Sequence, residues 1–338
     1  MERIAIIGTG LIGGSIGLAL KAARLNDLEV VGFDIERGTA GEAKRRGAVD
    51  RNAPSLAEAV RGAKMVVIAT PPLSVGNVMQ EISEHLAEGA VITDTASTKI
   101  EVRRYAQEFL PEHVSFIGGH PMAGKEDQGI KNADAALFQG AAYCVIPSPQ
   151  ASEGAVKSVL GLVSVLGAEP LFIDAEEHDQ YAAAISHMPL VVSTALFSLV
   201  RNSPAWGDIA PLAAGGFRDT TRLASGDPRM SHDICATNAE GVIHWLDRFI
   251  EELRRYRAMI QTDRKALLKT YTETQIQRDA FIAGERPKRT ADFEMPSTKD
   301  AIGSMLLGNL VSSKMDKMEK EMGQSGPRKP RSVLDDED

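Results

Sequence analysis

The sequence predicts an α/β fold, with a doubly wound and mostly parallel sheet followed by an all-helical C-terminal domain. In residues 1–174, short apolar runs rich in Val and Ile alternate with helical patterns. Such alternation is typical of right-handed crossovers, which build parallel sheets. After residue 174 the strand pattern ends, and apolar residues recur at helical spacing instead.

Seven apolar runs are expected to form the strands of this sheet. They are RIAIIG from Arg3, EVVGFD from Glu29, KMVVIAT from Lys64, AVITDT from Ala90, VSFI from Val114 to Ile117, AYCVIP from Ala142 and PLFID ending at Asp174. Helix signals lie between these runs. Ser55 precedes the run LAEAV as an N-cap, and Thr98 with Glu101 is typical of a capping box.

Three long segments with helical periodicity are expected in the second domain, beginning at Glu177, Ser231 and Asp263. Within the first of them, a helix from about Tyr181 to Val200 is apolar on almost all sides rather than along one stripe. Such a pattern indicates burial on several sides. We therefore expect a homodimer built on the helical domain.

These patterns divide the chain into four parts. A nucleotide-binding sheet domain is expected over 1–174, and a helical substrate and dimerisation domain over 175–285. One extra amphipathic helix is expected within 286–322, and the Gly, Pro and charged residues of 323–338 predict a disordered tail. A chain of 338 residues is long enough for two domains with separate cores.

Composition favours a cytoplasmic protein. Apolar residues make up 43% of the chain and charged residues 25%, as in ordinary globular domains. No run reaches the ~20 apolar residues of a membrane span, and the first strand begins too early for a signal peptide before it. The net charge of −8 argues against a nucleic-acid partner, and Cys144 and Cys235 have no metal-type spacing. We expect no membrane, nucleic acid or metal in its function.

The segment GTGLIG, which begins at Gly8, has the spacing G-x-G-x-x-G directly after the first strand. Gly8 would make a tight turn, Gly10 would let the backbone approach a pyrophosphate, and Gly13 would let helix and strand pack closely. The helix that begins at Leu11 and Ile12 would direct its N-terminus at phosphate groups. This context predicts a dinucleotide site on a Rossmann-type domain.

Asp34 follows the second strand, ~20 residues beyond this segment. Its carboxylate can accept hydrogen bonds from both hydroxyls of the adenosine ribose and would repel a 2′-phosphate. NAD is therefore favoured over NADP. Arg37 could instead turn towards a 2′-phosphate or be a solvated charge, and the same spacing also serves FAD. Thr70 and Pro71 follow the third strand run at the edge where ligands bind, either as cofactor contacts or as a rigid turn.

A second unusual segment is GGHPMAG, from Gly118 to Gly124, after the strand run that ends at Ile117. His120 is therefore expected in a loop at the carboxyl edge of the sheet, on the same side as the glycine-rich turn. One interpretation is a general base, because an imidazole with a pKa near ~6.5 suits proton abstraction at neutral pH. The other interpretation is a loop histidine that caps a backbone carbonyl.

The segment DTASTK, from Asp94 to Lys99, ends the preceding strand and should face the same crevice. Ser97 could hydrogen-bond a substrate hydroxyl, and Lys99 could pair with a phosphate or a carboxylate. Alternatively, Ser97 and Thr98 only cap the helix that follows.

Six short segments follow one another in a fixed order from Met1 to about Ile282. They are GTGLIGG, DTASTK, GGHPMAG, EHD at Glu177 to Asp179, SHMP at Ser186 to Pro189 and GFRDTTR at Gly216 to Arg222. In this combination the chain resembles the prephenate and arogenate dehydrogenases of tyrosine biosynthesis. The resemblance implies an NAD-dependent oxidative decarboxylation without a metal. Hydroxyacid and imine reductases would share the glycine-rich segment but usually place a lysine, not a histidine, at the catalytic centre.

The resemblance also implies roles for single residues. His120 matches the base that takes the proton of the ring 4-hydroxyl, and Ser97 matches the serine that holds this hydroxyl. Arg222 matches the arginine that binds a substrate carboxylate, a contact that suits a guanidinium fork. Without the resemblance, Arg222 would be interpreted as an exposed basic residue.

Ser186 and His187 fit the helix that borders the substrate in this family, although His187 would suit a helical core equally well. His178 and Asp179 are expected to be architectural, as part of a helix N-cap.

Two positions depart from the family pattern near the substrate. Lys125, next to Gly124, stands where a serine or threonine is common, and Leu190 stands where many prephenate-specific members have a second histidine. We expect prephenate as the substrate, with Gly124 and Lys125 beside it. Arogenate, or both compounds, is the alternative, and a non-catalytic NAD sensor is a third hypothesis.

Overall fold

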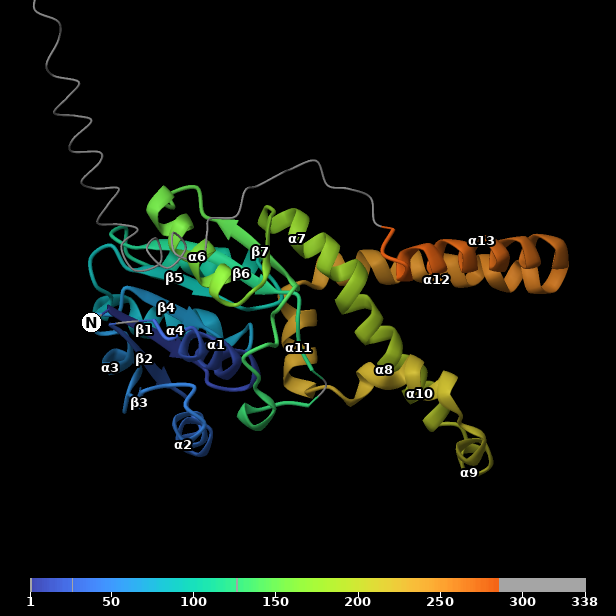
Figure 1. Ribbon diagram of the computed structural model, residues 1–338. Coiled ribbons are helices and arrows are strands. Elements are labelled where there is room, and N and C mark those ends of the chain that lie inside the picture. Colours follow the sequence, from blue (N-terminus) through green and yellow to red (C-terminus); the bar gives the residue numbers. More distant parts are fainter. Residues whose placement is uncertain (1, 26, 126, 286–338) are drawn as a thin grey trace, which may run out of the picture.

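The computed structural model describes residues 2–285 except 26 and 126 (Figure 1). Its sheet has the strand order β3-β2-β1-β4-β5-β6-β7-β8. The strands are β1 Glu2–Ile7, β2 Leu28–Phe33, β3 Arg51–Asn52, β4 Met65–Ile68, β5 Val91–Asp94, β6 Ser115–Pro121, β7 Ala142–Pro147 and β8 Glu169–Phe172. The expected extra helix within 286–322 and the tail 323–338 lie outside the described residues.

All neighbouring strands pair in parallel except β6 and β7, which are antiparallel. The first strand shows how both faces are filled. Ile4 and Ile6 of β1 belong to one buried cluster, whereas Ala5 and Ile7 belong to the other. Successive side chains of a strand point to opposite faces, so a strand covered on both sides is apolar throughout. This arrangement confirms the predicted doubly wound fold.

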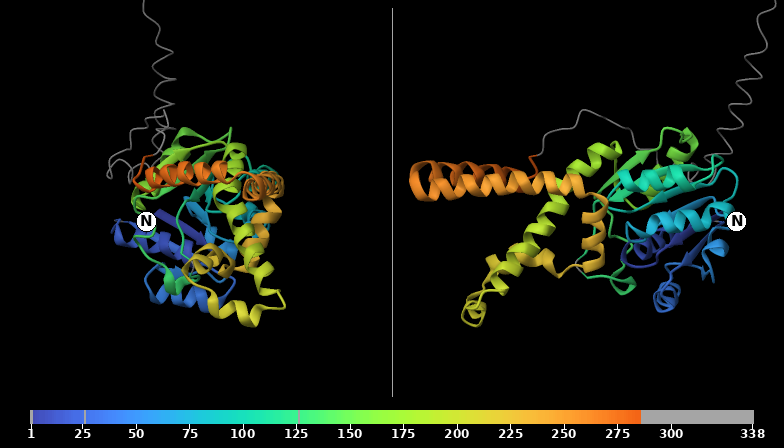
Figure 2. Two further views of the ribbon diagram at one scale, coloured as in Figure 1. Left: turned by 90° about the vertical axis from the view of Figure 1, so that its right-hand side faces the viewer. Right: turned by 180° about the vertical axis from the view of Figure 1, so that it is seen from behind.

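Helices cover both faces of the sheet (Figures 1 and 2). They are α1 Leu11–Ala22, α2 Arg37–Arg45, α3 Leu56–Val60, α4 Ser74–Ile82, the short helix Ser83–His85, α5 Ile100–Phe109, the short helix Ile130–Asn132 and α6 Glu153–Val165. Helices α1 and α6 pack into the cluster with Ile4, and α3, α4 and α5 into the cluster with Ala5. As expected, Ser55 caps α3 by accepting from the amide of Glu58.

The structure extends β6 beyond the predicted strand run. The run was expected to end at Ile117, but β6 continues to Pro121, so the expectation that His120 lies in a loop is wrong. His120 pairs with Cys144 of β7 instead. Gly119 permits this close pairing, because a Cβ atom there would lie 2.5 Å from the carbonyl oxygen of Asp94 and 2.6 Å from the hydroxyl of Tyr143.

The second part of the chain is helical, as predicted. Its elements are α7 Ala175–Ala182, a π-helical segment Ala183–His187, α8 Met188–Arg201, α9 Trp206–Ile209, a turn of 3₁₀ helix Ala210–Leu212, α10 Gly215–Thr221, a second such turn Arg222–Ser225, α11 Pro228–Thr237, α12 Ala239–Thr262 and α13 Arg264–Ile282. Helices α12 and α13 form a long hairpin that projects from the sheet domain, and α8 leads into a second arm (Figures 1 and 2).

Two helical expectations need correction. The periodic segment from Ser231 is two helices, α11 and α12, separated at Asn238. The side-chain amide of Asn238 donates to the carbonyl of Asp179 at 2.7 Å, so this residue serves a contact between helices. The run from α7 through α8 is interrupted by the π-helical segment. Pro189 lies one turn later and lacks the N–H that a regular helix would use there, which accounts for the interruption.

The apolar helix Ala175–Arg201 is only partly buried within one chain. Ile185 is 68% exposed and Leu199 75%. By length and composition, this helix is the one candidate membrane span among the described residues, with 17% of its most apolar window buried. The expected burial on several sides is therefore not provided by the chain itself.

Candidate active site

The glycine-rich turn after β1 has the geometry that a dinucleotide site needs. Gly8 has φ +87°, and a Cβ atom there would lie 2.5 Å from the carbonyl oxygen of Ala69. At Gly13 a Cβ atom would lie 1.9 Å from the carbonyl oxygen of Gly8. At Gly10, in contrast, nothing lies within 4 Å of that position. Gly8 and Gly13 are therefore required by the fold, whereas the open space at Gly10 fits a bound group.

The surroundings of this turn also fit such a group. Helix α1 begins at Leu11 and Ile12 with no side-chain cap and no acidic residue in its first turn, which leaves its N-terminus free for an anion. Asp34 accepts from the backbone amide of Thr9 at 2.8 Å and so fixes the turn against the end of β2. Across the turn, the hydroxyl of Thr70 is buried without a hydrogen-bond partner.

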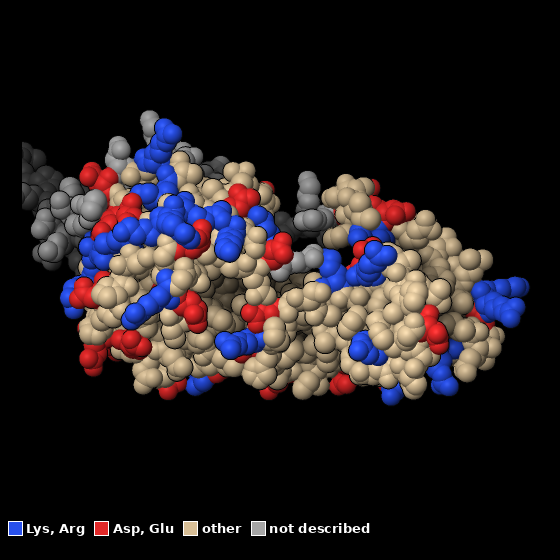
Figure 3. All heavy atoms as spheres, turned by 90° about the horizontal axis from the view of Figure 1, so that it is seen from below, with Lys and Arg blue, Asp and Glu red and all other residues tan. Residues whose placement is uncertain are grey.

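Basic side chains are exposed on the sheet domain (Figure 3). Pro71, beyond Thr70, is exposed, and so is Arg37 at the start of α2. Seen from below, Lys and Arg side chains gather more densely on the sheet-domain half of the molecule than on the helical half (Figure 3). Helix α2 contributes Arg37, Lys44 and Arg45 to the positive charge of the sheet domain.

His120 contacts a second histidine and, through it, a carboxylate. Its Nδ1 lies 2.9 Å from Nε2 of His178, although the two residues are 58 positions apart. Nδ1 of His178 lies 2.8 Å from Oδ1 of Asp179. His178 is 2% exposed and Asp179 1%, so this pair lies buried behind His120. The expectation of a merely architectural role for His178 overlooked this contact.

Asp179 also caps helix α5. Its Oδ1 accepts from the backbone amide of Lys99 at 2.7 Å, and its Oδ2 accepts from that of Ile100 at 2.9 Å. The capping box predicted from Thr98 and Glu101 is therefore wrong, since α5 has no side-chain cap from within its own segment. The hydroxyl of Thr98 lies 2.9 Å from that of Thr237 instead. The helix cap of α7, in turn, comes from Asp174.

Two histidines of the site, His120 and His187, have lowered pKa values. Burial lowers the pKa of His120 well below its usual range, and the neighbouring His178, Lys99 and His187 lower it further. Burial likewise lowers the pKa of His187 to about 4, although Asp179 opposes the shift. A neutral imidazole can accept a proton at physiological pH, which a base requires.

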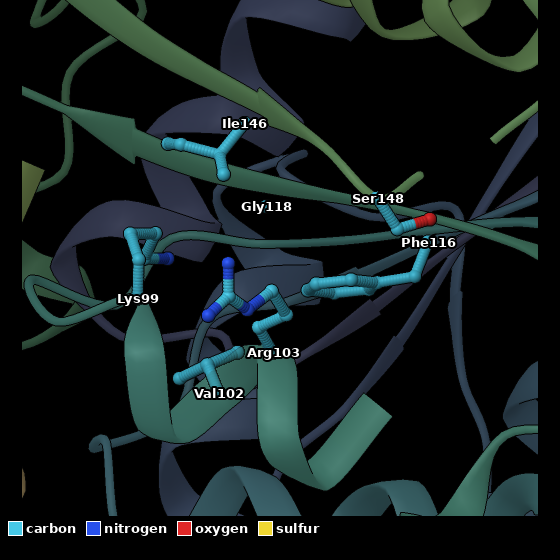
Figure 4. Close-up of a pocket in the computed structure, with 7 residues that line it drawn as sticks. All are labelled: Lys99, Val102, Arg103, Phe116, Gly118, Ile146 and Ser148. Atoms are coloured by element: carbon cyan, nitrogen blue, oxygen red, sulfur yellow. The ribbon is translucent and has the colours of Figure 1, made fainter. Parts of the chain in front are cut away.

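Lys99 is buried and paired within the protein. Its ammonium donates to Asp94 Oδ2 and, at 2.6 Å, to the carbonyl of Gly119. The amide of Gly119 donates to Asp94 Oδ1 at 3.2 Å. Figure 4 shows the Lys99 side chain at the N-terminal end of α5, directed towards the strands that carry Gly118 and Ile146. The carboxylate partner considered for Lys99 is thus Asp94, and the pair fixes the residue before His120.

Two further polar atoms near the base are buried without a partner. They are the hydroxyl of Ser97 and Nε2 of His187. Nδ1 of His187 lies 3.2 Å from the side-chain amide nitrogen of Asn238, which can only donate. His187 therefore carries its proton on Nε2. Buried polar groups are normally satisfied, so these two atoms are suited to a bound molecule.

The other predicted substrate residues lie nearer the surface. Ser186 and Arg222 are exposed, and the turn that begins at Arg222 packs against α8. Gly124 is exposed, and a Cβ atom there would meet nothing within 4 Å. The Lys125 ammonium lies 3.3 Å from Oδ2 of Asp134.

Comparison with known proteins decides the family. Residues 16–171 match the family model for the nucleotide-binding domain of prephenate dehydrogenase, and residues 174–273 match the model for its dimerization domain. A prephenate dehydrogenase of Bacillus subtilis is 34% identical over 300 residues, which cover 87% of this chain and 80% of that protein. The chain belongs to the prephenate dehydrogenase family.

Other family members differ in substrate. A cyclohexadienyl dehydrogenase of Zymomonas mobilis is 32% identical over 283 residues, covering 83% of this chain and 96% of that protein. Among solved structures, a prephenate dehydrogenase from Aquifex aeolicus in complex with hydroxyphenyl propionate and NAD+ is similar at a TM-score of 0.77 and 26% identity, covering 83% of this chain and 98% of that one. A Synechocystis arogenate dehydrogenase is similar at 0.70 and 27%, covering 82% and 99%.

In this prephenate dehydrogenase family member, the candidate site joins the two matched regions. His120 and Ser97 belong to the nucleotide-binding region, whereas His178, Asp179 and His187 belong to the dimerization region. The sequence did contain a signal for the missed pair, because the segment EHD includes both residues. Its partner could not be identified, since the contact crosses between regions that are distant in the sequence.

Proposed function

We propose that this protein catalyses the NAD-dependent oxidative decarboxylation of prephenate to 4-hydroxyphenylpyruvate. The observation that carries the proposal is a neutral, half-buried His120 whose Nδ1 is engaged by His178, which leaves Nε2 as the basic nitrogen. Family membership supports the same reaction. A non-catalytic NAD sensor would have no use for such a base.

In the proposed mechanism, His120 Nε2 takes the proton of the ring 4-hydroxyl while the carbonyl forms at that carbon. Ser97, whose hydroxyl has no partner in the protein, hydrogen-bonds the same oxygen. Bound NAD supplies the acceptor for the hydride that leaves the ring carbon. The bond to the ring carboxylate then breaks, carbon dioxide departs, and its electron pair completes the aromatic ring. His120 returns its proton to the phenolate oxygen, so the proton count balances.

NAD rather than NADP is the proposed cofactor. The Asp34 carboxylate lies at the end of β2 and is fixed by Thr9, where its charge would repel a 2′-phosphate. Arg37 lies exposed nearby and is a solvated charge in this proposal. The residues proposed to bind the cofactor are Gly8, Gly10, Leu11, Ile12, Gly13, Asp34, Thr70 and Pro71.

Substrate binding is proposed to involve both regions of the chain. Arg222 binds a substrate carboxylate through its guanidinium fork. His187 offers the proton on its unpartnered Nε2, and Ser186 lies beside it on the π-helical segment. Such segments occur frequently at functional sites. Gly124 and Lys125 contribute from the sheet domain.

The helical region is proposed to form a homodimer. The matched family model describes this region as a dimerization domain, and its exposed apolar helix needs a cover. The same helix carries the buried Asp179 and His187, which contact the rest of the protein and do not suit a lipid phase. We therefore propose a cytoplasmic dimer with domains over 1–174 and 175–285, acting without nucleic acid, membrane or metal.

Arogenate is the second candidate substrate. Leu190 stands where many prephenate-specific relatives have a histidine, and it lines an open groove between α8 and α11 together with Thr194 and His232. A relative at 32% identity is a cyclohexadienyl dehydrogenase. These observations favour a pocket for the substrate's side chain that does not require the keto group of prephenate.

Absorbance of the reduced nicotinamide tests these proposals, with prephenate and arogenate each offered with NAD and with NADP. We expect turnover with prephenate and NAD. His120→Asn should keep NAD binding while turnover falls ~10²-fold or more, the usual contribution of a general base. The exposed His85 provides a control, since His85→Asn should behave as the wild type. NAD binding without turnover on either acid would favour the sensor.

A further inference from the structure

We propose that His178 and Asp179 are positioning residues that set the tautomer of His120 and stabilise its protonated form. This inference rests on the proposed role of His120 as the base. It assigns a catalytic purpose to a buried pair that belongs to the other region of the chain.

The directions of the hydrogen bonds between Asp179, His178 and His120 follow from the Asp179 carboxylate. A carboxylate can only accept, so Nδ1 of His178 donates its proton to Asp179 Oδ1 at 2.8 Å. In the neutral tautomer that this bond selects, Nε2 of His178 carries no proton. It accepts from Nδ1 of His120 at 2.9 Å, which places the proton of His120 on Nδ1. The remaining nitrogen, His120 Nε2, is left with a free lone pair for the substrate hydroxyl.

The Asp179 carboxylate is itself held rigidly. It accepts from the backbone amides of Lys99 and Ile100 as well as from His178, and it is 1% exposed. The N-terminus of α5 thus holds the carboxylate and fixes its plane. Because these contacts orient the acceptor, the His178 ring cannot rotate without breaking its own hydrogen bond to Asp179.

The pair also matters once the base has taken a proton. An imidazolium at His120 is disfavoured by burial and by the neighbouring His178, Lys99 and His187. A hydrogen bond through His178 to the Asp179 carboxylate offsets part of this cost, as an aspartate does behind the histidine of other catalytic sites. No covalent bond is made or broken in this step, and the proton stays on His120 until it returns to the product.

Two substitutions of one residue separate positioning from packing. His178→Leu removes the acceptor for His120 Nδ1 while keeping an apolar filling, and we expect kcat to fall ~10²-fold with an unchanged KM for NAD. His178→Gln can present a carbonyl oxygen near the position of Nε2, so it should recover kcat to within ~10-fold of the wild type. Asp179→Asn should lower kcat without changing the KM for NAD. His85→Gln is the matched exposed control.

The tautomer can be observed without substrate. In protein labelled with ¹⁵N at histidine and saturated with NAD, we expect His120 to carry its proton on Nδ1 in the wild type and in His178→Gln. In His178→Leu, a population protonated on Nε2 should appear. The resonance is assigned by its loss in His120→Asn.

Three results would overturn the inference. They are wild-type kcat in His178→Leu, equal losses in the Leu and Gln variants, and an unchanged His120 nitrogen pattern in His178→Leu. Failure of the proposed function would look different, because the wild type would then be inactive on both acids. The nitrogen pattern would still show whether the pair sets the tautomer of His120.

Discussion

At the scale of single residues, the base combines two properties that oppose each other. Burial keeps His120 neutral, which makes it available to accept a proton, but the same burial weakens it as a base. The Asp179 carboxylate, which contacts His120 through His178, stabilises the imidazolium of His120 once the proton has been taken up. The His178 and Asp179 pair thus stabilises protonated His120 without placing an unpaired charge beside the substrate.

This balance predicts how activity depends on pH. Since the pKa of His120 in the substrate-free protein is lowered, nearly all molecules keep a neutral His120 down to more acidic pH. The acid limb of kcat/KM should therefore lie below ~6.5, the ordinary value for histidine. Initial rates with prephenate and NAD between about pH 4.5 and 8 would show it, after checking that the protein stays folded across this range. A limb at or above the ordinary value would contradict this environment for the base.

At the scale of elements, helix α5 is the point where the sheet and the helical region are joined. Its N-terminus is capped from α7 by Asp179, and Lys99 reaches from it to β5 and β6. Both amide and carbonyl of Gly119 are held by this ion pair, so β6 is fixed next to His120. The base thus depends on an element that it does not belong to.

Removing the charge on Lys99 should destabilise this junction. Lys99→Met leaves Asp94 buried at 0% exposure without its counter-charge, and we expect ~3–5 kcal/mol less free energy of unfolding. Combining it with Asp94→Asn should recover most of the loss, since the uncompensated charge is then gone. Denaturant unfolding at one protein concentration measures both. Arg104→Met on the same helix is the control, because that side chain is 57% exposed. A loss as small as the control's would show that Lys99 is not structurally required.

The same elements show what the sequence could and could not predict. Gly8, Gly13 and Asp34 lie within one short unit, so their spacing was sufficient to predict the turn. The extent of β6 depended on pairing with β7, and a strand run ending at Ile117 could not reveal it. The contact between His120 and His178 depended on how two regions pack together. Local patterns therefore predicted the fold and candidate residues, whereas hydrogen-bond partners required the structure.

At the scale of the whole molecule, the two projecting arms leave apolar side chains uncovered. Leu199 on α8 is 75% exposed, and Ile276 on α13 is 64% exposed. Scattered apolar residues are normal on a surface, but here they follow one long helix and a hairpin. Two copies that cover these arms would bury them as an obligate interface does.

The dimer can be tested by charge placed on these arms. Leu199→Glu and Ile276→Glu each put a carboxylate where a dimer would bury it, and we expect the dissociation constant to rise ~100-fold or more, because an unpaired buried charge is costly. Sedimentation at micromolar concentration should show a dimer for the wild type and a folded monomer for at least one variant. Ile35→Glu serves as the control, since this side chain is 86% exposed on the sheet domain and should leave the dimer intact. A monomeric wild type would remove the dimer and leave the exposed helix without a cover.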